Sequence, residues 1–490
     1  MRQSFDAQMR LDCSSVPNVQ LNLDCRDEII PILAALKHIY SQPEVRNGIL
    51  HAIAEDVNGT SSANRGRKGM DYWQILVLAA VRLGCNLDYD KLQDLAEQHR
   101  VLRQIMGIGD WDQQTTFDLR RIRDNITQVR PGTIERINHL IVAEGHRLVP
   151  EASQTVRADS FVAETEIHYP SESSLIRDGL RKVLELSVAL AAAVGMGGWR
   201  QHKHLYKKAK GLARRIDRIA SRKGSGYQER LKGPYRELLG LVETITARVE
   251  KLRENVRNSA LSNVEVLALD GQLKGFLERT LQVSHTARRR ILQGEKVPNS
   301  EKLFSIFEPH TQLYKRGKAG QPLQFGRQVL IYEDGAGFIA QAYLMPRDAD
   351  DRDVVIEQTR KLQERLNGGI QRASFDRGFH SPENQRQLDL LIPHPCLPKP
   401  GVRQAAAQQA QATVEFRRAR QRHSGIESAI HGLQSGNGMA RCRDRTEQGF
   451  SRYLQLGVLG RNLHVLGKIL IARQDASSNA SRSKRQQPAA

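Results

Sequence analysis

Cysteines are scarce in this sequence and never stand close together. The chain has five in 490 residues, and none forms a Cys-x-x-Cys pair. A disulfide framework needs closely paired cysteines, and a structural zinc site needs ligands at short spacing. The pattern therefore excludes both as organising features and predicts reduced thiols in a cytoplasmic protein. The five are Cys13, Cys25, Cys85, Cys396 and Cys442.

Long apolar runs and two common catalytic signatures are also missing. The most apolar stretch, residues 184–196, is shorter than the roughly 20 residues that span a bilayer. Residues 1–15 lack the apolar core of a signal peptide. The sequence contains neither a GxxxxGK[ST] loop nor a GxSxG elbow. These absences argue against a membrane protein, an encoded ATP-driven motor and a nucleophile-elbow hydrolase.

Positive charge is abundant. The chain carries 74 Lys and Arg against 54 Asp and Glu, a net charge of +20. An excess of this size indicates a polyanionic partner, with nucleic acid as the first candidate. Hydrophobic residues make up 39% of the chain and glycine adds 38 residues, which is ordinary for soluble domains that bury a core. At about 150 residues per domain, the length predicts roughly three domains.

Residues 1–150 are predicted to form an all-helical N-terminal domain. Apolar side chains recur there at helical spacing in five segments. The segments are residues 26–40, 72–83, 89–105, 119–127 and 133–145.

From residue 155 the pattern changes to short strands alternating with helices. A strand at 155–162 precedes a hairpin of 328–333 and 338–344, whose connecting loop has hairpin chemistry. A helix, a strand, a helix, a strand and a long polar helix to about residue 433 follow. The later strands are expected at 372–376 and 390–394. This order predicts an α/β domain with a mixed sheet, formed by residues 151–177 and 301–470.

The intervening residues 178–300 are predicted to be a helical insertion. Apolar residues repeat with heptad spacing over 231–256 and again over 205–219, which predicts an antiparallel coiled-coil hairpin. Residues 200–223 hold ten Lys and Arg against one acid. This run is either a solvated face or a phosphate-binding face. The candidates for DNA contact in it are Lys207, Lys208, Arg214 and Arg215.

The end of the chain is predicted to be a disordered basic tail, residues 471–490. From residue 473 onward it holds no apolar residue larger than alanine except one proline. Such a segment cannot bury enough apolar surface to order itself.

Three acids stand out by their placement. Asp159 lies in the first strand, Asp376 at the end of another and Glu427 in the late helix. Adjacent strands can bring the aspartates together, and a helix across the sheet can add the glutamate. Clustered carboxylates need a cation, and oxygen ligands favour Mg²⁺ or Mn²⁺. Two such ions about 3.5–4 Å apart support phosphoryl transfer. The alternative is that Asp376 merely ends a strand and pairs locally.

Three segments around these acids resemble the motifs of DDE transposases from bacterial insertion sequences, most closely the ISNCY group. They are residues 157–171, 374–381 and 422–443, and residues 66–78 match as well. The resemblance covers about residues 1–470. It implies an RNase H-like fold for the mixed-sheet domain, with Asp159, Asp376 and Glu427 as catalytic metal ligands. The implied cofactor is a pair of Mg²⁺ ions, with Mn²⁺ as a substitute.

The chain departs from the family pattern near the glutamate. No tyrosine closely precedes Glu427, and Gln434 stands where a lysine is often found. Arg441 and Arg443 are candidates to take over a phosphate or flanking-DNA contact. Two histidines four residues to either side of Glu427, at 423 and 431, are expected to share its helix face. They either approach the scissile phosphate or are merely nearby.

The resemblance implies a transposase that binds the double-stranded terminal DNA of its element and catalyses metal-dependent strand cleavage and strand transfer. It would act at the bacterial nucleoid in the cytoplasm, without ATP or a membrane. Synapsis of two ends implies a homodimer. The alternatives are a metal-dependent nuclease without joining activity and a non-catalytic DNA-binding regulator derived from a transposase. The N-terminal cations expected to bind the element ends are Arg65, Arg67, Lys68 and Arg120.

Overall fold

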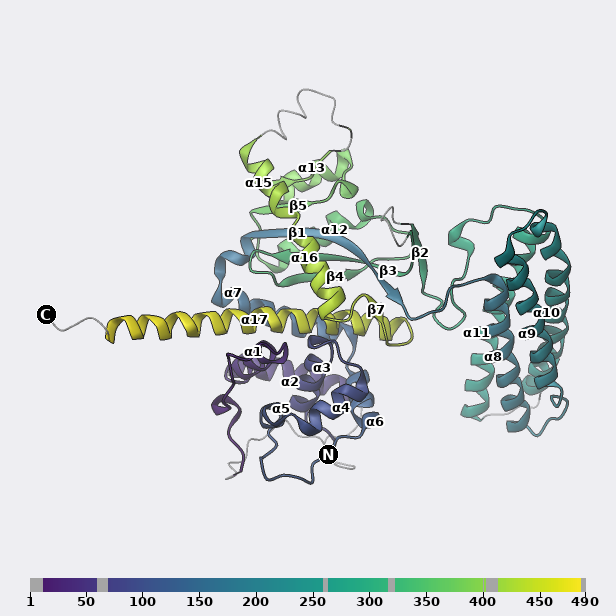
Figure 1. Ribbon diagram of the computed structural model, residues 1–490, viewed down its shortest axis with the longest axis horizontal. Helices are drawn as coiled ribbons and strands as arrows, with labels where there is room; N and C mark the ends of the chain where they lie inside the picture. The colour runs from purple at the N-terminus through teal and green to yellow at the C-terminus, as the bar shows by residue number, and fades with distance from the viewer. Residues whose placement is uncertain are drawn as a thin grey trace. The chain divides into compact units, whose positions relative to one another are not determined.

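The computed structural model describes residues 12–59, 69–258, 263–315, 322–399, 401 and 413–485. The chain divides into two compact units. The sheet unit comprises Met1–Glu166 and Arg327–Ala490, and the insert unit comprises Ile167–Gly326. Figure 1 shows the elements of both units. The predicted cations Arg65, Arg67 and Lys68 lie outside the described residues.

Helices of the sheet unit form where apolar side chains recur at helical spacing. All five predicted N-terminal segments are helical, although residues 89–105 form two helices because His99 starts the second by accepting a hydrogen bond from the Leu102 N–H (3.0 Å). The helix after Gln42 was not predicted, despite Pro43 at its first position. The helices are α1 (Ile29–Tyr40), α2 (Pro43–Asn58), α3 (Tyr72–Gly84), α4 (Tyr89–Gln98), α5 (Arg100–Ile105), α6 (Leu119–Gln128), α7 (Pro131–Leu148), α12 (Asp351–Arg365), α13 (Pro382–Leu391), α15 (Val414–His423), α16 (Ile426–His431) and α17 (Glu447–Arg485).

Seven strands form one open mixed sheet, so the predicted α/β class is confirmed. Its order is β2-β3-β1-β5-β6, with β4 paired to β3 and β7 paired to β1. The pair β3–β4 is the predicted antiparallel hairpin, whereas β5 runs parallel to both β1 and β6. The strands are β1 (Thr155–Thr165), β2 (Gln312–Lys315), β3 (Leu323–Asp334), β4 (Ile339–Leu344), β5 (Arg372–Phe375), β6 (His394–Cys396) and β7 (Arg441–Cys442).

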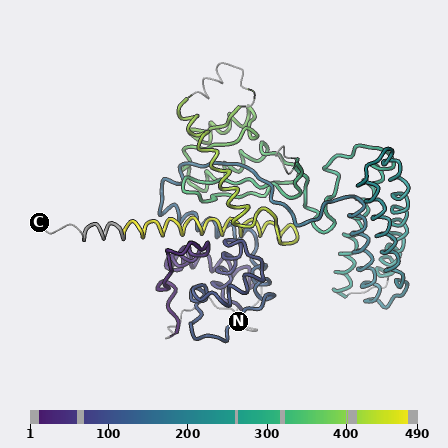
Figure 2. Tube along the Cα trace, in the orientation of Figure 1, coloured from purple at the N-terminus to yellow at the C-terminus, as the bar shows by residue number. Residues whose placement is uncertain are grey.

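The last helix, α17, joins the N-terminal helices to the sheet. It packs against α1, α3, α7 and β4 (Figures 1 and 2). Its glycines allow backbone contact: a Cβ atom on Gly460 would lie 2.6 Å from the Cα atom of Gly84. Farther along, the fully buried Asn462 accepts a hydrogen bond from the Ile339 N–H (2.8 Å) and donates one to Asn138 Oδ1 (3.3 Å). These contacts fix α17 in both position and rotation.

Helix α17 continues to Arg485 and so runs into the stretch for which a disordered tail was expected. Nucleating a helix is unfavourable, but extending one requires only residues that tolerate helical geometry. The buried first half supplies the nucleus, and the following alanines, serines and basic residues can propagate it. Residues 486–490 lie outside the described part of the chain.

The described residues of the insert unit form four α-helices rather than a hairpin alone. They are α8 (Glu172–Ala193), α9 (His202–Arg222), α10 (Tyr227–Asn258) and α11 (Val264–Ala287). The predicted hairpin corresponds to α9 and α10, which pack on each other. Helices α8 and α11 also contribute apolar faces to the same core, including Leu180 and Leu277.

The heptad seam of α10 is buried inside this core. Leu238, Ile245 and Val249 have no exposed surface. The seam therefore serves the packing of its own chain. Within the described ranges, no helix combines the length and hydropathy that crossing a bilayer would require.

Replacing Gly460 by alanine is expected to destabilise the sheet unit. Alanine favours a helix over glycine by about 0.5–1 kcal/mol, but here its methyl group would strike the backbone of α3. Overpacking of this kind costs about 1–3 kcal/mol. Urea denaturation of Gly460→Ala should therefore show a lower free energy of unfolding.

Gly48→Ala is the matched control for that experiment. Gly48 is also inside a helix of the sheet unit, and a Cβ atom there would meet only Leu140 Cδ1 at an ordinary 3.5 Å. This variant should be as stable as the parent or slightly more stable. If Gly460→Ala behaves in the same way, the close approach of α17 and α3 is wrong.

Candidate active site

The two predicted aspartates belong to neighbouring strands, with Asp159 in the middle of β1 and Asp376 directly after β5. Strands β1 and β5 are parallel, with Arg157 opposite Ser374 and Ala158 opposite Phe375. Continued by one residue, this register brings Asp159 opposite Asp376. Because neighbouring strands lie about 4.8 Å apart and paired side chains share a face, we expect the two carboxylates to point to the same side of the sheet. Asp159 is half-buried and Asp376 is exposed.

A fourth acid, Asp351, lies near Asp376 and was not predicted from the sequence. A Cβ atom built on Gly378 would lie 3.7 Å from Asp351 Oδ2 and 4.0 Å from Asp376 Oδ2. Asp351 Oδ1 accepts a hydrogen bond from Gln328 Nε2 (2.8 Å). In the sequence, Asp351 belongs to an acidic run after the hairpin that reads only as the start of a helix.

Glu427 follows a break between two helices that pack on this part of the sheet. Helix α15 packs on β5 and β6, and α16 packs on β1. Arg157 holds the junction from below, because its Nη1 donates to the carbonyl of Arg422 (2.9 Å) and a Cβ atom on Gly425 would collide with its guanidinium. Arg157 precedes Asp159 by two residues and therefore lies on the same face of β1. Glu427 is exposed in the first turn of α16.

The single long helix predicted around Glu427 is therefore wrong, and with it the expectation that both neighbouring histidines share its helix face. His423 ends α15, whereas His431 ends α16. Even so, His423 lies near the acids: its Nδ1 is 3.1 Å from Ser374 Oγ. Burial lowers the pKa of His423, while the negative charges of Asp376 and Glu427 act in the opposite direction. Both carboxylates therefore influence the pKa of His423.

The three predicted acids form a donor set of oxygen atoms only. Such a set suits Mg²⁺ or Mn²⁺ rather than a softer metal. In the parts of the chain that the structure describes, no three His, Cys, Asp or Glu side chains are grouped closely enough to hold an ion. The residues fit a divalent ion by chemistry and by shared face, and their side chains would have to turn toward one another to bind it.

The candidate DNA-binding residues differ in how far the fold uses them. Arg443 is occupied inside the sheet unit, since its Nη2 donates to Asn86 Oδ1 (2.7 Å) and its Nε to Tyr453 Oη (3.0 Å). Arg441 is exposed and forms ion pairs with Glu164 and Glu166 (3.3 and 3.7 Å). The other described candidates have exposed side chains on α6 or α9: Arg120, Lys207, Lys208, Arg214 and Arg215.

No family model matches the sequence, and neither the curated proteins nor the solved structures include a match. Function is therefore inferred from the chain's own residues.

The structure predicts that Arg157 stabilises the fold by neutralising a buried acid. Glu333 is 4% exposed and accepts a hydrogen bond from Arg157 Nη2 (2.5 Å). Burial raises the pKa of Glu333, and Arg157 acts against that rise. Removing one partner of a buried pair costs about 3–5 kcal/mol. Because Arg461 remains 3.9 Å from Glu333, Arg157→Met should lower the free energy of unfolding near neutral pH by up to this amount.

This loss should shrink in acid. Without Arg157 the folded-state pKa of Glu333 rises further above its ordinary value of 4.5, so the folded protein binds the proton more tightly than the unfolded chain. Stability then decreases as the pH rises from that value through the folded-state pKa. Urea denaturation near pH 5 and near pH 7 measures the difference. Adding Glu333→Gln should recover most of the loss near neutral pH; equal instability of the single and double variants would contradict the pairing.

Proposed function

We propose that this chain is a DNA transposase that carries out metal-dependent strand cleavage and strand transfer. The observation that carries the proposal is the β1–β5 register, which sets Asp159 opposite Asp376 when it is continued by one residue. Glu427 adds a third carboxylate from α16 above β1. Acids brought from separate parts of the chain to one face of a sheet, two of them exposed, suit a divalent ion and an anionic substrate better than they suit a stabilising role.

The same residues explain the proposed chemistry. Asp159, Asp376 and Glu427 would hold two Mg²⁺ ions, with Mn²⁺ as a substitute. When bound, such ions activate an attacking oxygen and stabilise the leaving oxygen of a phosphodiester. Arg157 positions the α15–α16 junction and hence Glu427. His423 contacts Ser374 on β5 and fixes the end of α15 next to the acids.

The sheet topology supports an RNase H-like catalytic domain as part of this proposal. The strand with the first acid, β1, lies between the β3–β4 hairpin and the parallel strand β5, after which the second acid follows. The insert unit interrupts the chain between β1 and the hairpin.

The excess positive charge of the chain supports DNA as the partner. Helix α9 presents exposed Lys and Arg, and α6 presents Arg120. Synapsis of two element ends would require a homodimer. Since the heptad seam is buried within its own chain, such a dimer would use other surfaces.

The decisive test is a cleavage and joining assay on labelled DNA that carries the sequences flanking the gene, with Mg²⁺. Asp376→Asn keeps the side-chain size but removes a ligand charge, so both cleavage and joining should fall by about a hundredfold or more. Asp389→Asn is the matched control, because Asp389 is exposed on α13 and bonded to Gln385 (2.8 Å). It should act like the parent protein.

Other outcomes of that assay would replace the proposal. Nicking without joined products would indicate a metal-dependent nuclease. Binding of the ends with neither cleavage nor joining would indicate a DNA-binding regulator. Titration calorimetry with Mn²⁺ tests the metal ligands without DNA. Asp376→Asn should lose Mn²⁺ binding. If the variant and the parent protein bind Mn²⁺ equally well, Asp376 is not a ligand.

The exposed cations of α9 give a separate prediction. Lys207 and Arg214 are seven residues apart and hence lie on one helix face. If each contacts a phosphate, Lys207→Ala/Arg214→Ala should reduce the slope of log affinity for duplex DNA against log salt by about 1.8, at about 0.9 per contact. Anisotropy titrations at several salt concentrations measure this slope. An unchanged slope would make this face a solvated surface.

A further inference from the structure

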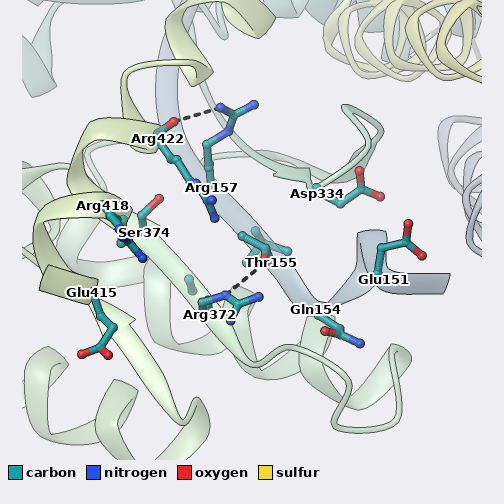
Figure 3. A pocket seen from close by; sticks show the side chains of 14 residues that line it. Glu151, Gln154, Thr155, Arg157, Asp334, Arg372, Ser374, Glu415, Arg418 and Arg422 are labelled. Atoms are coloured by element: carbon teal, nitrogen blue, oxygen red, sulfur yellow. Dashed lines mark hydrogen bonds between the residues drawn. The ribbon is translucent and has the colours of Figure 1, made fainter. Parts of the chain in front are cut away.

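A cavity lies on the same face of the sheet as the acids, next to them. Its volume is about 610 Å³, and it lies between α15 and the first residues of β1 and β5. In Figure 3 the side chains of Arg157, Arg372, Arg418 and Arg422 lie around its centre, whereas Glu151 and Glu415 stand at its two sides. None of these residues belongs to the three-carboxylate set.

Three of the four arginines are available to a ligand. Arg157 is held by Glu333 and by the carbonyl of Arg422. Among the described residues, Arg372, Arg418 and Arg422 form no ion pair, and the side chains of all three are exposed. Arg372 Nε donates only a long hydrogen bond, to Thr155 Oγ1 at 3.4 Å.

The acids in the lining offset this charge only in part. Asp334 is fully buried, bonded to His146 Nε2 (2.7 Å) and to backbone amides of its own turn. It is therefore committed to the fold. Glu151 and Glu415 remain, against three arginines whose planar guanidinium groups bind phosphate in a bidentate manner and stack on nucleobases.

Two residues that line the cavity precede the acids on the same strands. Arg157 precedes Asp159 by two residues, and Ser374 precedes Asp376 by two, which is roughly 7 Å along each strand. A polynucleotide with one phosphodiester at the acids would thus pass its next nucleotides over the arginines. The volume lies within the range of about 300–1,000 Å³ that is usual for ligand cavities.

We propose that this cavity binds the single-stranded flank of the DNA strand being cut, holding its phosphates with Arg372, Arg418 and Arg422. The assignment deepens the proposed transposase function and rests on it for the identity of the strand. It adds a site that holds the DNA strand next to Asp159 and Asp376. The arginines would recognise the phosphate group of a nucleotide, and a DNA strand and a free nucleotide both carry this group.

Helix α15 supplies a matched pair of variants for the test. Arg418 and Arg422 line the cavity, whereas Arg417 and Arg420 are exposed on the same helix and do not. Arg418→Glu/Arg422→Glu and Arg417→Glu/Arg420→Glu therefore change the charge of the chain equally. The backbone carbonyl of Arg422 that binds Arg157 is retained in both. Circular dichroism and the thermal midpoint check that both variants fold, and Arg372→Ala tests the cavity from β5.

Binding is measured by anisotropy with a labelled single-stranded oligonucleotide of roughly six nucleotides, in EDTA so that no cleavage occurs. Arg418→Glu/Arg422→Glu should weaken affinity by about tenfold or more and reduce the salt slope by about 1.4, at about 0.7 per phosphate. Arg372→Ala should weaken binding as well, and Arg417→Glu/Arg420→Glu should change it little. Equal weakening by the two double variants, or no weakening by either, overturns the proposal.

Two further arms separate the sources of the result. Competition by unlabelled oligonucleotide but not by deoxyadenosine monophosphate supports a strand subsite; equal competition by both overturns it in favour of a free nucleotide. If the cleavage assay fails while the α15 variants still differ, the transposase proposal fails and the strand-binding cavity stands.

Discussion

The sheet unit depends on one helix that approaches its neighbours at backbone distance. Where α17 crosses α3, Gly460 meets Gly84, and where it crosses α1, Gly467 meets the backbone of Pro31. Larger side chains would separate these layers. Asn462 then bonds the same helix to the first residue of β4. The position of the hairpin, and through β3 the position of β1, thus follows from how closely these helices pack.

The candidate site also depends on a close contact at a glycine. Arg157 occupies the space beneath Gly425, and its guanidinium connects the buried Glu333 to the end of α15. One side chain therefore couples the interior of the sheet to the helix break that presents Glu427. The acids themselves contribute little to this arrangement, because Asp376 and Glu427 are exposed. The scaffold holds the carboxylates in place, and the side chains of Asp376 and Glu427 face solvent.

Much of the sheet could be predicted from the sequence because its signals are local. Alternating apolar residues and turn-forming residues predict the hairpin around Asp334 and the strand that ends before Asp376. The pairing of β1 with β5 could be proposed, but its register depends on contacts more than two hundred residues apart. The break at Gly425 could not be predicted, since it depends on Arg157. Likewise, Asp351 joins the acids only through the folded position of Gly378.

The late position of α17 in the chain has a consequence for synthesis on the ribosome. The faces of α1 and α3 that it covers are made within the first 84 residues, whereas α17 begins at Glu447. These apolar faces emerge long before their cover exists. The insert unit, in contrast, is continuous in sequence and contains its own core, so it can fold as soon as it emerges. The insert unit can therefore be folded in the nascent chain before the last helix of the sheet unit has been synthesised. During that interval the apolar faces of α1 and α3 are most exposed to aggregation and most in need of a chaperone.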